Sequence, residues 1–197
     1  MRMPTKICSI AIVCVLCFQV NAYCSPWDDF LKKPKVDGLV MLKKSIGKNA
    51  EECDFGNPIN QSIAPDDKQI NKLFGFICHG NESAFRAALM VSKCFGTGDS
   101  EDFYRSSGLF FERKPLTFLK IIKEKKIQDS ELEDFLTMLP LYSVDKVDLK
   151  ISMIKNRIKI LGNIHDQRFN MLKTNGMRYL RKEKEFLESK QIEEDSK

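Results

Sequence analysis

The chain has 197 residues, of which 30% are charged, and a formal net charge of +5. A chain of this length suits one domain and can bury roughly 70% of its unfolded surface, so that its stability requires no metal or cofactor. The charge excess is too small to predict nucleic-acid binding, which needs clustered cations that release counterions.

The N-terminal segment has the three parts of an export signal. Arg2 and Lys6 make a basic start, an uncharged apolar run of about 12 residues spans 7–18, and Ala22 is the small residue that a signal peptidase requires. The run is shorter than the roughly 20 residues of a membrane-spanning helix. We expect cleavage between Ala22 and Tyr23 and a secreted or periplasmic product with no membrane span; an uncleaved, buried N-terminal helix is the alternative.

Removal of this segment changes the charge and the cysteine content. It takes away two basic residues and no acidic one, which lowers the formal charge from +5 to +3. Three of the seven cysteines leave with it, and Cys24, Cys53, Cys78 and Cys94 remain. No two of these have the CxxC spacing of a metal site, so we expect disulfides in an oxidising compartment. Four cysteines allow three pairings, and a single disulfide with two free thiols is the alternative.

The segment after the signal, residues 23–65, is rich in residues that interrupt helices. Seven prolines and glycines are spread along it: Pro26, Pro34, Gly38, Gly47, Gly56, Pro58 and Pro65. One short helical pattern runs through Leu39, Leu42 and Ile46. We expect an irregular, cysteine-containing segment that disulfides hold against the rest of the protein.

Residues 66–164 show helical spacing with short connections. Ile70, Leu73, Phe74 and Ile77 form an amphipathic stripe, and Gly80 marks the end of that helix. Further helix starts are expected near residues 82, 100, 115, 130 and 144, with Pro115 in a first turn and a capping box formed by Ser130 and Glu133. Pro140 ends the fifth helix. These residues form the predicted helical core.

The longest helix is expected from Ser143 to Leu161, because apolar residues recur there at spacings of three and four. Residues 165–197 are predicted to form a weakly amphipathic C-terminal helix with a charged tail. Asn175 and Gly176 interrupt its pattern, and the tail from Lys190 onward is expected to fray.

Strand signals are nearly absent, so the predicted fold class is all-α with about six to seven helices. Alternate helix starts recur every 30 to 34 residues, roughly the size of a helical hairpin. The same spacing also arises in an irregular bundle of average helices. The sequence therefore leaves two arrangements open: an irregular bundle, or a short repeat-like array of helical hairpins.

The helix assignment ranks the disulfide pairings. If the helices at 66–79 and 82–95 form an antiparallel hairpin, Cys78 lies at the turn and Cys94 lies roughly 18 to 20 Å away. A disulfide requires Cα atoms within about 7 Å. The sequence therefore favours a disulfide between Cys53 and Cys94, with Cys24 and Cys78 as the second pair.

The search for catalytic chemistry identifies no candidate residue. Two histidines, His79 and His165, lie far apart in the sequence, and metalloprotease, serine hydrolase, phosphate-loop and calcium-loop motifs are absent. No catalytic, metal-ligating or cofactor-binding residue is predicted. Four basic residues near the C-terminus alternate with glutamates and indicate a salt-bridged surface: Arg178, Arg181, Lys182 and Lys184. Four phenylalanines are predicted to be core: Phe103, Phe110, Phe111 and Phe118.

Three classes of function remain open from the sequence. The first is an exported protein that binds a protein partner, as an inhibitor, immunity protein or adaptor does. The second is an enzyme whose site is assembled from scattered residues. The third is an envelope-associated structural or assembly factor that uses its long helix and charged tail. The first is favoured because it requires no catalytic residues; the oligomeric state is left open.

Overall fold

The computed structural model describes residues 25–47 and 64–195, and every regular element in these ranges is helical, with no strand. The predicted all-α class is thereby confirmed. The elements are α1 (Pro26–Lys32), α2 (Val36–Ile46), α4 (Asp67–Cys78), α5 (Glu82–Val91), η2 (Ser92–Cys94), α6 (Thr97–Arg113), α7 (Pro115–Lys125), α8 (Asp129–Thr137), η3 (Leu141–Ser143), α9 (Val147–Gly162), η4 (Gln167–Phe169) and α10 (Asn170–Asp195).

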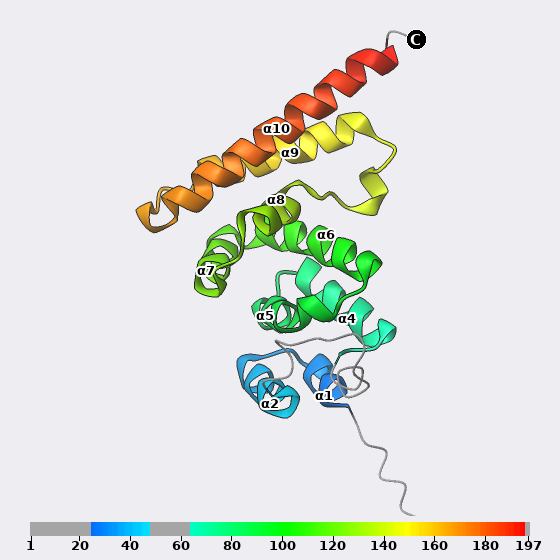
Figure 1. Ribbon diagram of the computed structural model, residues 1–197, viewed down its shortest axis with the longest axis vertical. Helices are drawn as coiled ribbons and strands as arrows, with labels where there is room; N and C mark the ends of the chain where they lie inside the picture. The colour runs from blue at the N-terminus through cyan, green and yellow to red at the C-terminus, as the bar shows by residue number, and fades with distance from the viewer. Residues whose placement is uncertain (1–24, 48–63, 196–197) are drawn as a thin grey trace, which may run out of the picture.

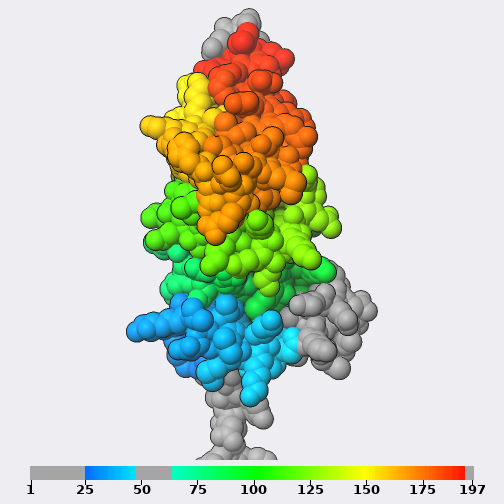
Figure 2. Space-filling model, turned by 90° about the vertical axis from the view of Figure 1, so that its left-hand side faces the viewer, coloured from blue at the N-terminus to red at the C-terminus, as the bar shows by residue number. Residues whose placement is uncertain are grey.

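The helices are stacked along one long axis, with α1 and α2 at one end and α9 and α10 at the other (Figures 1 and 2). Each layer packs on its neighbours: α1 on α2 and α4, α4 on α5 and α6, α6 on α7 and α8, and α10 on α8 and α9. Each helix therefore packs mainly on helices that are close to it in the sequence. Among the described helices, none is both long and apolar enough to cross a membrane.

The centre of the stack is filled by phenylalanine side chains. The four predicted core residues are fully or almost fully buried, which confirms their assignment. Phe85 lies in the middle, with its ring centroid 4.7 Å from that of Phe110 and 5.7 Å from that of Phe118. Such ring pairs add roughly 0.5–1.5 kcal/mol each beyond the burial of apolar area. This cluster joins α5, α6, α7 and α8 into one core.

Most helix starts in the core follow the local signals in the sequence. Asp66 and Gln69 form a reciprocal capping box at α4, Asn81 accepts from Ala84 N at the start of α5, and Pro115 occupies the first turn of α7. The predicted capping box of Ser130 and Glu133 is wrong. The helix begins one residue earlier, at Asp129, so Ser130 lies inside the first turn and cannot cap it.

The expectation of an irregular segment over residues 23–65 is wrong for residues 26–32, which form α1, whereas the short helical pattern expected through Leu39, Leu42 and Ile46 is confirmed by α2. Pro26 lies in the first turn of α1, where proline is compatible with a helix, and Ser25 accepts from Trp27 N as the N-cap. Trp27 and Phe30 are buried in the core. The proline therefore starts a helix instead of preventing one, and burial of its apolar face stabilises it. The structure does not describe residues 48–63.

The C-terminal helix also differs from its prediction. The longest helix is α10, with 26 residues, whereas α9 has 16, and α10 continues through Gly176 without interruption. A Cβ atom at Gly176 would lie 2.8 Å from Leu136 Cδ1 and 2.9 Å from Leu161 Cδ2. The glycine is present because α8 and α9 approach α10 closely at this point.

Arg157 on α9 is completely buried and joins three elements. Its Nε donates to Glu112 Oε1 on α6 (2.7 Å), and its Nη1 donates to the carbonyl oxygens of Leu136 (2.8 Å) and Met138 (3.0 Å) at the end of α8. The guanidinium lies against Gly108, where a Cβ atom would be only 2.5 Å from Nη2. Burial lowers the pKa of Arg157, and the charge of Glu112 partly offsets this effect. The Nη2 atom of Arg157 is buried and has no hydrogen-bond partner among the described residues.

We expect Glu112→Ala to lower the free energy of unfolding by about 3 kcal/mol, because it leaves a buried guanidinium without its counter-ion. The matched control is Glu101→Ala on the same helix, whose exposed carboxylate pairs with Arg105. It should cost less than about 1 kcal/mol. Urea denaturation of both variants measures the difference, and equal costs would contradict the role assigned to Arg157.

Candidate functional site

A cleft of about 550 Å³ opens beside the phenylalanine core, where the end of α5 and η2 meet α6 and the α7–α8 connection. Its apolar lining includes Leu89, Met90 and Ile127, and its polar lining includes Tyr104 and Glu131. Ser92, Gln128 and three lysines complete the lining: Lys93, Lys125 and Lys126. The cleft, defined by these residues, thus combines an apolar part, an acid, a phenol and cations.

Two irregular connections shape this cleft. The first is the short 3-10 turn of η2, which carries Lys93 past the end of α5. The second is Lys126, which ends α7 in the left-handed conformation with φ 52°. A side chain in this region costs of order 1 kcal/mol, since a glycine is usual at such a helix end. This strained backbone redirects the chain so that Ile127 lines the cleft.

Three titratable groups in or next to the cleft have raised pKa values: Glu131 and Tyr104, which line it, and Asp134, which lies one turn after Glu131 on α8. Burial raises the pKa of Glu131, which the charge of Asp134 raises further and that of Lys93 lowers. Burial and then the charge of Glu133 raise the pKa of Asp134. Burial, followed by the charges of Glu131 and Asp134, raises the pKa of Tyr104. Partial burial is thus the largest cause of the raised pKa in all three groups.

Within the part of the chain that the structure describes, these two carboxylates have no directly bonded counter-ion. Among the described residues, neither Glu131 nor Asp134 has an ion-pair or side-chain hydrogen-bond partner, whereas Glu101 and Glu112 do. The ring of Tyr104 is held by Phe135, with centroids 5.2 Å apart. Perturbed, unpaired titratable groups in a cleft are typical of functional sites. The arrangement suits a basic side chain that lies along the apolar part of the cleft and reaches the carboxylates.

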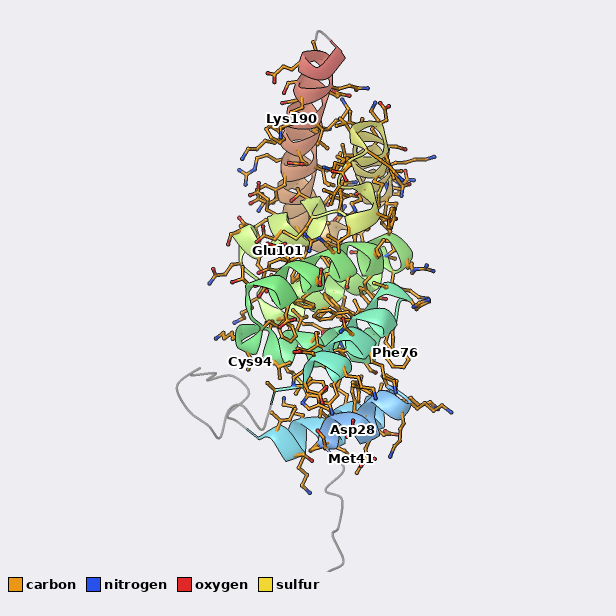
Figure 3. The ribbon with its side chains drawn as sticks, turned by 90° about the vertical axis from the view of Figure 1, so that its right-hand side faces the viewer. Asp28, Met41, Phe76, Cys94, Glu101 and Lys190 are labelled. Atoms are coloured by element: carbon orange, nitrogen blue, oxygen red, sulfur yellow. The ribbon has the colours of Figure 1, made fainter. Side chains whose placement is uncertain are left out.

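The sequence-predicted disulfide residues lie partly outside the described ranges. Cys24, Cys53 and the expected cleavage position at Ala22 and Tyr23 fall among the residues that the structure does not describe. Cys94 is half-buried in η2, directly after Lys93 of the cleft (Figure 3). The pairing of Cys53 with Cys94 stays a prediction.

Cys78, at the end of α4, is a free thiol, whereas Cys94 is not a free thiol. The free thiol at Cys78 contradicts the predicted second pair, Cys24 with Cys78. The sequence assigned this pair only as the remainder once Cys53 and Cys94 were joined, and no geometric requirement favoured it. The alternative of one disulfide with two free thiols stays open, because Cys24 and Cys53 lie outside the described residues.

The two histidines are not part of the cleft that the described residues form. His79 follows α4, and its Nδ1 donates to the carbonyl oxygen of Gly75 at 2.7 Å, as a residue at a helix C-terminus does. His165 is exposed in the connection between α9 and η4. No group of three or more His, Cys, Asp or Glu residues suited to a metal ion occurs within 25–47 and 64–195.

Of the four basic residues expected to form a salt-bridged surface, Lys182 and Lys184 make ion pairs, Arg178 contacts Tyr179, and no ion pair is seen for Arg181 among the described residues. Lys184 pairs with Glu188 (2.7 Å), Lys182 lies 3.8 Å from Glu133, and the Arg178 guanidinium stacks on Tyr179.

Sequence reasoning did not identify Tyr104, Glu131 or Lys126 as site residues. In the sequence, Glu131 looks like an ordinary acid in the first turn of a helix, and Tyr104 looks like a core aromatic. Only the packing of η2, α6 and α8 brings them together, so no local pattern could have revealed the cleft.

No protein-family model, curated protein or solved structure matches this chain. Its function must therefore be inferred from its own residues.

We expect Glu131→Gln to raise the free energy of unfolding at pH 7 by on the order of 0.5 kcal/mol, a small gain because solvent screens the half-exposed carboxylate. The pKa of Glu131 is higher in the folded than in the unfolded state, so its ionisation disfavours the folded state. This loss of stability is absent well below pH 4.5 and is complete once the pH exceeds the raised pKa. The gain should vanish near pH 3, where the wild-type carboxyl is protonated. Thermal unfolding across this pH range measures it.

The control for this prediction is Glu188→Gln. A hydrogen bond from Lys184 lowers the pKa of Glu188, so the sign is reversed and this variant should not gain stability at pH 7. If Glu131→Gln behaves like Glu188→Gln, the carboxylate in the cleft is not destabilising.

Proposed function

We propose that this protein is exported and acts by binding a protein partner through the cleft formed by η2, α6 and α8. The observation that carries the proposal is the pair of half-buried, unpaired carboxylates, Glu131 and Asp134, beside Tyr104. A chain that leaves two carboxylates desolvated without a counter-ion loses stability, and a partner cation would recover it.

The chemistry of the cleft supports a polypeptide ligand. Leu89, Met90 and Ile127 can contact the aliphatic stem of a lysine or arginine while Glu131 accepts from its charged end. Lysines 93, 125 and 126 on the rim match acidic residues that flank such a side chain in a partner. A mixed apolar and charged surface of this kind is typical of protein interfaces.

Export and the disulfide belong to the same proposal. A signal peptide over residues 1–22 would deliver the chain to an oxidising compartment, where Cys53 and Cys94 would join. Closing this loop of about 42 residues would stabilise the fold by about 4 kcal/mol in the chain-entropy model. Because Cys94 directly follows Lys93, the disulfide would also hold the η2 side of the cleft.

Affinity capture with the mature, oxidised protein tests the partner. A specific partner should bind the wild type, and Glu131→Lys should weaken the capture at least about tenfold because it reverses the charge that receives the cation. Glu185→Gln, an exposed glutamate on α10, is the control and should bind as the wild type does. If Glu131→Lys leaves the capture unchanged, the cleft is not the binding site. If the wild type captures no specific partner, the proposed function is wrong.

Peptide mapping with and without reduction tests the compartment and the disulfide. We expect the N-terminus of the native protein to be Tyr23, a linked peptide pair containing Cys53 and Cys94, and alkylation of Cys78 without reduction. An intact Met1 together with a reactive thiol at Cys94 would contradict both parts.

A further inference from the structure

The first half of α10 has a basic outer face. Residues 170–182 contain four basic residues and no acidic one. Three of the four are exposed, Arg178, Arg181 and Lys182, and their spacings of three and four residues place them on one side of the helix. Figure 2 shows this half of α10, in orange, at the surface of the molecule. These three residues form the basic face of α10.

The two arginines of the basic face are not neutralised by acidic residues of the described chain. Arg181 makes no ion pair there, whereas Lys182 lies 3.8 Å from Glu133. Arg178 donates to Tyr179 Oη (3.0 Å), and its Cζ lies 4.9 Å from the centroid of the same ring. This stacking holds the Arg178 guanidinium in place, so that less side-chain entropy is lost when it binds an anion.

A groove of about 710 Å³ runs along the basic face. Every described residue that lines it belongs to α10, and Glu185 is the only acid among them. The lining cations extend from Lys173 to Lys182, which is roughly 14 Å along a helix. A single phosphate or carboxylate is much shorter than this. The groove therefore suits an extended ligand that carries several negative charges.

The composition of the groove distinguishes among extended anions. Nucleic acid binds tightly through many phosphate contacts, and here few cations are available, since Lys173 already donates to the carbonyl oxygens of Gly162 and Ile164. A helix that binds a membrane surface has a large apolar face, whereas Met177 is the only apolar residue in the described lining. A guanidinium, in contrast, binds a carboxylate through two parallel hydrogen bonds. Carboxylates of a polypeptide are therefore the favoured ligand.

We propose that the basic face of α10 binds an acidic helical segment of a partner protein. Carboxylates that recur at spacings of three and four residues lie on one side of such a segment, so they can meet Arg178, Arg181 and Lys182 when the two helices lie side by side. This surface goes beyond the proposed function, because the groove shares no lining residue with the cleft and binds the opposite charge.

Fluorescence anisotropy with the purified protein tests this proposal. The probe is a labelled, alanine-based helical peptide with glutamates at spacings of three and four residues. We expect saturable binding that weakens with added salt, because exposed charges are screened. Arg178→Glu with Arg181→Glu should weaken binding at least about tenfold. The matched control is Lys43→Glu with Lys44→Glu, which makes the same change in net charge at exposed residues of α2 and should bind as the wild type does.

A milder pair of changes separates lost binding from lost folding. Arg178→Gln with Arg181→Gln should keep the helical circular dichroism of the wild type and still weaken peptide binding. Overturning results are no saturable binding by the wild type, binding that either arginine pair leaves unchanged, or an equal loss in the α2 control. Tighter binding of a heparin oligosaccharide or of phosphatidylglycerol vesicles through the same arginines would also overturn it, as would self-association that the arginine changes abolish.

Discussion

The buried guanidinium of Arg157 is the constraint on which the arrangement of the helices depends. A cation without solvent must be paired, and here Glu112 of α6 and two carbonyl oxygens at the end of α8 receive it. The buried guanidinium also restricts its neighbours sterically: Gly108 leaves room for it, because a Cβ atom at this position would lie 2.5 Å from Nη2. One side chain thus specifies how α9 sits against α6 and α8, and α10 follows because it packs on α8 and α9.

The layered packing separates the surfaces by position. In such a stack, each layer is stabilised by its neighbours. The proposed binding cleft lies on a side of the stack, where the end of α5 and η2 face α6 and the α7–α8 connection beside the phenylalanine core.

The charged side chains of the core and those of the cleft differ in whether they have partners. In the core, Arg157 is buried with a counter-ion and two carbonyl acceptors, although its Nη2 has no hydrogen-bond partner among the described residues. Glu131 in the cleft and its neighbour Asp134 on α8 are half-buried with no such partners among the described residues, and Lys126 has a left-handed backbone conformation. Local losses of stability of this kind are typical of sites that interact with something else. The contrast is why the cleft, and not the more strongly buried ion pair, is the candidate site.

The sequence by itself determined the all-α class, the stripe of α4 through Ile70 and Ile77, and the helix start at Pro115, because these depend on spacing and backbone chemistry within a few residues. It misjudged α1 and the continuity of α10, because Pro26 and Gly176 are helix breakers in general but fit these particular positions, one in a first turn and one at a close helix contact. The layered order of the helices, the pairing of Arg157 and the cleft around Glu131 were decided only by tertiary structure. Each joins residues from different helices, and helical periodicity specifies which face is buried but not which neighbour covers it.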